Sequence, residues 1–353
     1  MGTCNCKEGK NEDGGVIVEE RQRSNLAKQQ ATSPTENVNS SEISIPTKPD
    51  PSYLCQVQAV FKGYLSREAL PKNLPEFELN ELNELNSVPK MISAQTEQML
   101  QELGSFKLAK PCHSESVKRG PVQLKNGNVY EGEWNRKHQP HGKGTMYFTD
   151  GGIYEGEWKE AKFHGKGRRV YPNGDYYEGD FFEGKMEGKG DLVTKDGSKY
   201  SGDWKNDKQE GQGIETWLNG SKFTGVYKDG MKNGKGVFEW EDGSKYEGDF
   251  ANNEIEGYGK YEWVTGRSYE GEWKNNKMHG KGSFRWDDGR YYRGEYSEDK
   301  KHGYGEFYWP KKGKKYQGQW VNGKQHGEGV LIDAKGNKKT GVWQNGKPVS
   351  RNV

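Results

Sequence analysis

Residues 269–286 read YEGEWKNNKMHGKGSFRW, and this stretch contains the alternation that decides the fold. In an extended chain Tyr269, Gly271 and Trp273 fall on one face, and the two glutamates between them fall on the other. The last five residues, GSFRW, again place a glycine and two aromatic residues on one face. The run between these segments is rich in asparagine and lysine and is turn-prone. The stretch therefore predicts a β-hairpin that buries one aromatic face.

The same unit recurs along the C-terminal two thirds of the chain. Its first motif begins at Tyr130, Tyr154, Tyr177, Tyr200, Phe223, Tyr246, Tyr269, Tyr292 and Tyr316, with a weaker copy at Lys339. The step is 23 residues, with two single-residue insertions, and each motif is followed by a G-x-G. An Asp-Gly or Asn-Gly pair, such as Asp288-Gly289, usually follows the second strand and favours the positive φ of a hairpin turn. The repeat positions that we expect to be structural include Tyr130, Gly132, Trp134, Tyr154, Gly156, Trp158, Tyr269, Gly271, Trp273, Tyr316, Gly318 and Trp320.

Composition limits how such hairpins can fold. Only 30% of the 353 residues are hydrophobic, whereas the chain has 50 Gly, 20 Tyr, 12 Phe and 11 Trp. A lone hairpin is marginally stable in water, so the units must stack and bury each other's aromatic faces. We predict an all-β fold, an elongated single-layer ribbon of stacked 23-residue β-hairpin repeats, preceded by a largely disordered N-terminal region with short helices. A formal net charge of only +2 argues against a nucleic-acid partner.

The pattern Y-x-G-x-W-x6-G-x-G at a 23-residue step resembles the MORN (membrane occupation and recognition nexus) repeat family, with nine clear copies and a partial tenth over residues 120–353. The resemblance implies a scaffolding, dimerising or lipid-proximal module. Members often carry a catalytic domain as well, but the first 119 residues contain too little folded-looking sequence for one. We therefore expect no enzymatic activity and no cofactor.

Three rows of the repeat could carry chemistry. A row of histidines precedes the G-x-G and could form a metal ladder, although a repeated turn position is the favoured interpretation and we expect no metal: His141, His164, His279, His302 and His326. A row of acids could supply the paired carboxylates of a glycosidase, although a solvated face is favoured: Glu133, Glu157, Asp180, Asp203, Asp249, Glu272 and Glu295. A row of lysines in the hairpin turns could meet anionic lipid or an acidic partner, or be an ordinary solvated edge: Lys159, Lys205, Lys208, Lys228, Lys274 and Lys277.

The N-terminus, MGTCNCK, resembles the signals of doubly acylated peripheral membrane proteins. The resemblance implies myristate on Gly2 and palmitate on Cys4 and Cys6. Cys6 departs from the signal, which has Ser or Thr at that position. A single myristoyl chain binds membranes weakly, so the two cysteines matter for attachment. The alternative is a tail whose glycine and cysteines are incidental.

Residues 51–72 resemble the IQ motif, which binds calmodulin-like EF-hand proteins. The motif positions are Val57, Gln58, Phe61, Lys62, Gly63, Arg67 and Leu70. On a helix the apolar residues share one face, and the basic residues can meet the acidic rim of a groove. An ordinary amphipathic helix that packs on the repeats is the alternative.

We divide the chain into a tail over 1–50, the IQ helix over 51–72, an acidic linker with a short helix over 73–119, and the repeats over 120–353. The short helix is expected from Lys90 to Leu103, packed on the first repeat as a cap, with partner binding as the alternative. At the other end, we expect an open sheet edge with exposed Trp320 and Trp343. Such an edge favours a homodimer through the C-terminal repeats.

Together these features predict a non-enzymatic, membrane-associated scaffold at the cell cortex or cilium. Its IQ helix would bind a calmodulin-type or centrin-type protein, and its repeats would bind other proteins or a second copy. The alternative is a non-catalytic regulatory subunit whose repeats bind anionic phospholipid. The start of the chain is too polar for a signal peptide, which favours the cytoplasm.

Overall fold

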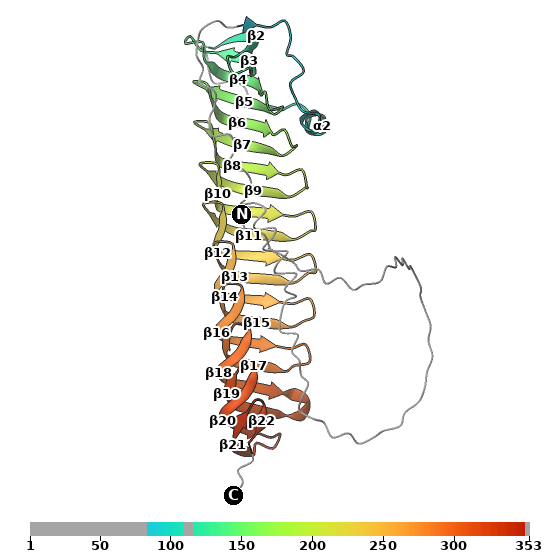
Figure 1. Cartoon of the computed structure of the whole chain (residues 1–353), viewed down its shortest axis with the longest axis vertical. Helices are drawn as coiled ribbons and strands as arrows, with labels where there is room; N and C mark the ends of the chain where they lie inside the picture. The colour runs from blue at the N-terminus through green and yellow to red at the C-terminus, as the bar shows by residue number, and fades with distance from the viewer. Residues whose placement is uncertain (1–82, 109–115, 350–353) are drawn as a thin grey trace, which may run out of the picture. The chain divides into compact units, whose positions relative to one another are not determined.

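The computed structural model of the protein describes residues 83–108 and 116–349. Within these residues, twenty-two strands form one antiparallel sheet in which strands adjacent in sequence pair with each other (Figure 1). Each repeat contributes one hairpin, and successive hairpins pair in turn, as β15 with β16 and β16 with β17. The predicted single-layer ribbon of stacked hairpins is confirmed.

The first strands of the repeats are β3 (Val129–Trp134), β5 (Ile153–Lys159), β7 (Tyr176–Phe182), β9 (Lys199–Lys205), β11 (Lys222–Lys228), β13 (Lys245–Ala251), β15 (Ser268–Lys274), β17 (Tyr291–Ser297), β19 (Lys314–Val321) and β21 (Lys338–Gln344). The second strands are β4 (Pro140–Tyr147), β6 (Lys162–Val170), β8 (Lys185–Val193), β10 (Lys208–Thr216), β12 (Met231–Glu239), β14 (Glu254–Glu262), β16 (Lys277–Arg285), β18 (Lys300–Trp309) and β20 (Lys324–Ile332). The remaining elements are β1 (Asn83–Glu84), α2 (Ala94–Leu103), β2 (Val117–Gln123), η1 (Pro310–Lys312) and β22 (Lys347–Pro348).

Two kinds of turn connect the strands. Within a repeat, a two-residue turn such as Asn275-Asn276 has φ of 49° and 63°, the backbone of the tight turns that suit the twist of a hairpin. Between repeats, only Gly289 of the Asp288-Gly289 pair has positive φ, at 84°, and its N–H donates to the carbonyl of Trp286 at 3.1 Å. The predicted positive φ at the glycine is thus present, but the turns with two positive φ values are those beside the lysines.

An aromatic ring lying across two glycines forms the core of the nine clear repeats; it is a tyrosine in all but one, which has Phe223. The hydroxyl of Tyr269 donates to the carbonyl of Glu272 at 2.9 Å, which lays the ring over Gly271 and its cross-strand partner Gly282. A Cβ at Gly282 would lie 2.4 Å from the Tyr269 hydroxyl. Tyr130, Tyr154 and the tyrosines of the later repeats are likewise buried, with 0% exposure. At Gly271 a Cβ would meet the Gly282 Cα at 2.5 Å and the Tyr269 hydroxyl at 2.7 Å, so the ring and the opposite backbone together require glycine.

Edge-to-face contacts join these tyrosines into a ladder that crosses repeat boundaries. Tyr269 contacts Trp273 of its own repeat and Tyr296 of the next, with ring centroids 5.0 and 5.2 Å apart and interplanar angles of 89° and 85°. The same double contact recurs from the first repeat, where Tyr130 meets Trp134 and Trp158, each at 5.1 Å. Such pairs add roughly 0.5–1.5 kcal/mol each beyond burial. The aromatic positions therefore bind neighbouring repeats together as well as filling their interiors.

Short strands pair with the first and last hairpins of the sheet. At the front, β2 pairs with β3 on one side and with β1 on the other. At the back, the expectation of exposed tryptophans is wrong, because Trp320 and Trp343 are only 4% and 8% exposed. Both pack against Tyr316, and β22 covers part of the edge of β21.

The close approach of ring and glycine makes a direct test of the core. Gly282→Ala should lower the free energy of unfolding by about 1–3 kcal/mol, because the added methyl group displaces the ring of Tyr269. The matched control is Gly120→Ala in β2, where a Cβ meets nothing within 4 Å and stability should change little. Urea unfolding followed by tryptophan fluorescence measures both. Equal stability of the two variants would contradict this account of the core.

Candidate functional site

The repeated acids hold the backbone of most hairpins, and Val226 and Gln319 stand at the same position in two others. Between Gly271 and Trp273 the pairing shifts, so that the opposite strand carries extra residues in a bulge. Glu272 accepts the N–H of Lys281 in this bulge at 3.0 Å, and Asp249 accepts that of Tyr258 at 3.0 Å. Where the repeat has an acid, the first glycine of its G-x-G makes room for the carboxylate: at Gly280, with φ of 54°, a Cβ would lie 2.2 Å from the Glu272 Oε2.

The charge state of Asp249 fits that structural role. Partial burial opposes ionisation of Asp249, but hydrogen bonds from Lys235 and from the Tyr258 N–H hold the pKa of its carboxyl below the usual value. Neighbouring lysines alternate with the acids across the sheet, as in the ion pairs of Lys166 with Asp180 and Lys235 with Asp249, each at 2.7 Å. The row is thus a set of backbone acceptors, and the geometry gives no support to a glycosidase pair.

The histidines occupy a backbone-binding position as well. At this position of other repeats, Glu187 and Glu256 accept the N–H of Asn206 and Asn275 in the turn of the following repeat, at 2.9 and 2.8 Å. His141 faces the corresponding N–H of Glu160 with its Nδ1 at 3.4 Å. No group of three or more His, Cys, Asp or Glu side chains with metal-site geometry occurs among the residues that the structure describes.

The predicted lysine edge is partly neutralised. Its lysines lie at the strand ends that flank the two-residue turns rather than inside the turns. Lys208 pairs with Asp229 in the turn of the next repeat at 3.1 Å, and Lys277 pairs with Glu298 in the same way. Lys162, in the same row, pairs with Glu183 at 2.5 Å. Cations and anions therefore alternate along this edge.

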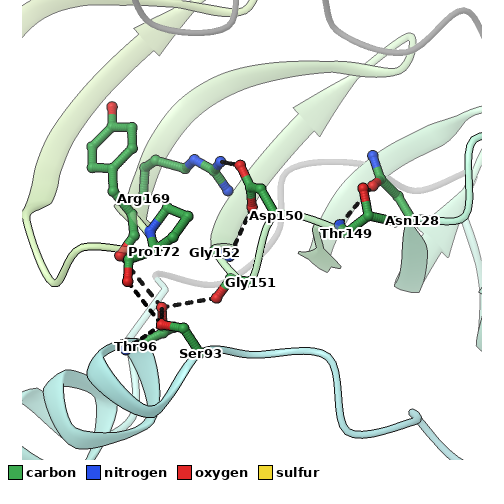
Figure 2. A network of polar contacts seen from close by, with 10 residues as sticks. Ser93, Thr96, Asn128, Thr149, Asp150, Gly151, Gly152, Arg169 and Pro172 are labelled. Carbon is green, nitrogen blue, oxygen red and sulfur yellow. Dashed lines mark hydrogen bonds and ion pairs between the residues drawn. The ribbon is translucent and has the colours of Figure 1, made fainter. Parts of the chain in front are cut away.

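Residues 93–106 lie against the first repeats. They contact the face of the sheet opposite the aromatic ladder, which we call the outer face. Ser93 caps α2 and donates to the carbonyl of Pro172 at 2.9 Å, and Thr96 donates to that of Gly151 at 2.8 Å (Figure 2). Further on, Arg168 donates to the carbonyl of Gly104 at 2.8 Å. The helix expected over 90–103 is thus α2, and it contacts the turns after the first and second repeats instead of closing the end of the sheet.

The sequence predicted that this helix packs on the first repeat, but not that Gly104 and Phe106 dock on the outer face, although a signal for that contact exists. Arg168 is 6% exposed, and its guanidinium lies 5.0 Å from the ring centroid of Phe106. Ile153 and Val170 are buried although they point away from the ladder. Most later repeats carry lysine in the row of Ile153, as at Lys199, Lys222 and Lys245, so an aliphatic residue there marks the covered part of the outer face.

Two lysines interrupt the aromatic interior. Lys232 and Glu215 form a buried ion pair at 2.6 Å, and Tyr227 donates to the same carboxylate at 2.9 Å. Lys301 is 7% exposed, with its Nζ 4.7 Å from the centroid of Phe307 and 4.8 Å from that of Trp320. Both lysines stand where another repeat has a methionine such as Met278, so they are departures from the repeat.

The remaining predicted sites lie outside the described residues. They are the acylation positions Gly2, Cys4 and Cys6 and the IQ positions Val57, Gln58, Phe61, Lys62, Gly63, Arg67 and Leu70. Within the part of the chain that the structure covers, no helix is long and apolar enough to cross a bilayer.

Comparison with known proteins agrees with the repeat architecture. The MORN repeat model matches nine consecutive segments, at 130–153, 154–176, 177–199, 200–222, 223–245, 246–266, 269–289, 292–314 and 316–338. Because these segments make up more than half of the chain, the protein belongs to the MORN repeat family, whose repeats are in general non-catalytic. No curated protein matches the sequence significantly.

Among solved structures, the chain is similar to the TCP domain of SAS-4 (dCPAP) from Drosophila melanogaster in complex with a proline-rich motif of Ana2 (dSTIL), with 12% identity, a TM-score of 0.25, and coverage of 68% of this chain and 99% of that one. The wild-type TCP10 domain of Danio rerio CPAP matches with 13% identity, a TM-score of 0.22, and coverage of 62% and 96%. TM-scores at this level establish no shared function.

Lys301 gives a prediction about pH. Burial, and secondarily the charge of Arg290, lower the pKa of its ammonium group to about 7. At pH values between this pKa and that of an unfolded lysine, Lys301 is protonated in the unfolded chain but not in the folded one. The free energy of unfolding should therefore rise with pH in this range. Lys301→Met should stabilise the protein at pH 6 by roughly 3–5 kcal/mol at most and flatten this rise. Urea unfolding at pH 6, 7, 8 and 9 measures both effects, and an unchanged slope in the variant would contradict the assignment.

Proposed function

We propose that the protein is a non-enzymatic, membrane-associated scaffold. The main observation behind this proposal is that the repeated polar residues bind the backbone of the repeats. Acids such as Glu272 and turn residues such as Asn276, which accepts the N–H of Ile255 at 2.7 Å, are engaged in backbone contacts within and between repeats. Side chains that would otherwise be candidates for chemistry thus support a long protein surface. An elongated surface of this kind suits simultaneous binding of several partners.

Membrane attachment in this proposal comes from the N-terminus, through myristate on Gly2 and palmitate on Cys4 and Cys6. The alternative, in which the repeats bind anionic phospholipid, has less support because carboxylates such as Asp229 and Glu298 neutralise lysines along the turn edge. Placement at the cell cortex or cilium follows the resemblance to membrane-associated scaffolds.

Partners in this proposal bind at two places. The IQ segment around Phe61 recruits a calmodulin-type or centrin-type protein by placing an amphipathic helix in its groove. The repeats bind other proteins or a second copy of the chain. Since Trp320 and Trp343 are buried, a homodimer at this end would use the backbone edge of β21 rather than exposed aromatic rings.

The membrane test uses the full chain. Gly2→Ala should move the protein from the membrane fraction to the soluble fraction of cells, because no myristate can then be added. The Cys4→Ser/Cys6→Ser double variant should be only weakly retained, since one acyl chain binds with an association constant on the order of 10⁴ M⁻¹. Unchanged membrane association of both variants would contradict attachment by acylation and favour lipid binding by the repeats.

The EF-hand test uses a synthetic peptide of residues 52–72. It should bind calmodulin or centrin in calorimetry, and Phe61→Ala should remove most of the affinity because it deletes the apolar contact in the groove. Lys62→Ala is the matched control: it should weaken binding modestly, and less so at high salt, since rim charges are screened. No detectable binding with or without calcium would contradict the IQ interpretation and favour the alternative, a helix that packs on the repeats.

A further inference from the structure

A second aromatic ladder runs along the sheet beside the Asx-Gly turns, on the same face as the tyrosines. From Phe238 to Trp309 it contains, in each repeat, an aromatic residue near the end of the second strand and the tryptophan two residues after it. Its rings are Trp217, Phe238, Trp240, Tyr261, Trp263, Phe284, Trp286, Phe307 and Trp309. The earlier repeats have Leu124, Phe148, Tyr171 and Thr194 at the tryptophan position, so the tryptophan row is a property of the C-terminal half.

Three consecutive members of this row, which we call the tryptophan strip, are only half-buried: Trp263, Trp286 and Trp309. Their indole N–H groups donate no hydrogen bond within residues 83–108 and 116–349, whereas the core tryptophans Trp273 and Trp320 donate to backbone carbonyls at 3.1 Å. The strip therefore presents aromatic surface together with free donors, the combination found in grooves that bind peptides through their carbonyls.

The spacing of the strip is fixed by the sheet. Successive tryptophans are one repeat apart, which is two strands, or about 9.5 Å at the usual strand separation. The phenylalanine ring between each pair of tryptophans sets an upper limit to their separation. The ring centroids of Trp263 and Trp286 lie 5.2 and 4.5 Å from that of Phe284. Those of Trp286 and Trp309 lie 5.2 and 4.4 Å from that of Phe307. A polyproline II helix repeats every three residues, or about 9.3 Å. A proline at every third position would thus meet one tryptophan in each repeat.

Charge beside the strip favours an acidic ligand. Arg267 lies 5.9 Å from the ring centroid of Trp263, and Arg290 lies 5.4 Å from that of Trp286. The turns next to the strip carry the cations Arg267, Arg290, Lys311, Lys312 and Lys314, against the anions Asp287 and Asp288. Of the two turns before them, residues 241–244 carry the acids Glu241 and Asp242, and residues 218–221 carry no charge. Arg290 is ion-paired with Asp288 at 2.7 Å, and the remaining cations give these turns a local positive excess.

We propose that the tryptophan strip binds an acidic, proline-rich segment of another protein in the polyproline II conformation, with prolines at every third residue seated on Trp263, Trp286 and Trp309. The preformed helix loses little conformational entropy on binding, and its exposed carbonyls accept the indole N–H groups. This inference rests on the proposed scaffold function only in that the repeats bind protein. It is independent of acylation and of the IQ segment, whose tests involve other residues.

The experiment titrates the full-length protein into fluorescein-labelled (Pro-Leu-Glu)₃-Pro, followed by anisotropy and by quenching of tryptophan fluorescence. A peptide of the same composition with its four prolines grouped at one end is the control for spacing. The periodic peptide should bind about tenfold more tightly than the grouped one, because only it can seat one proline on each tryptophan. Equal affinities, or no binding of the periodic peptide up to about 1 mM, a Kd at which binding is worth only ~4 kcal/mol, would overturn the proposal.

Two variants locate the site. Trp286→Leu, which introduces the residue found at the equivalent position Leu124, should weaken binding by about tenfold. Trp263→Leu is made in parallel, and the urea midpoint of each variant establishes that it folds. Tyr258→Ala, which removes a ring that is 52% exposed on the outer face, should leave the affinity unchanged within about twofold. Loss of binding in Tyr258→Ala, or unchanged binding in Trp286→Leu, would overturn the assignment of the peptide site to the tryptophan strip.

Discussion

The contact on which the rest of this structure depends is a tyrosine ring lying across two glycines. In a single-layer sheet no second sheet covers the core, so each ring must lie flat on its own hairpin to be buried. At Tyr269 this requires a bare backbone at Gly271 and Gly282, and the hydroxyl is held by the carbonyl of Glu272. The ring then presents its sides to the aromatic residues of its own and the next repeat. Glycine content and low hydrophobicity are thus two aspects of one packing solution.

The same solution leaves backbone groups that must be satisfied. The bulge that lets the second strand pass the ring would orphan an N–H, and a carboxylate from the paired strand accepts it, as Glu272 does for Lys281. A turn residue of each following repeat also binds the backbone of the repeat before it, as Asn276 binds Ile255. Polar residues therefore join neighbouring repeats, as the aromatic ladder does.

Residues that depart from the repeat pattern create local surfaces and, where a charge is buried, lower stability. Lys301 replaces an apolar residue and is held among aromatic rings at a pKa near 7, while Lys232 is compensated by Glu215. Apolar Ile153 on the outer face accompanies the docked segment around α2. Toward the C-terminus, tryptophans such as Trp286 replace smaller residues beside the turns and remain half-buried. A regular framework can carry such local variation because each repeat contacts mainly its neighbours.

The sequence by itself determined the period, the hairpin in each repeat and the buried face, because alternation along a strand fixes which side chains share a face. It also placed Tyr269, Gly271 and Trp273 together, since they lie within five residues. Only the tertiary structure decided that Glu272 binds the N–H of a residue in the opposite strand, and that Thr96 reaches a carbonyl 55 residues away. It likewise decided that Trp343 is buried at the end of the sheet. Such contacts join residues whose proximity depends on bulges, register and docking, and no local pattern along the chain encodes that proximity.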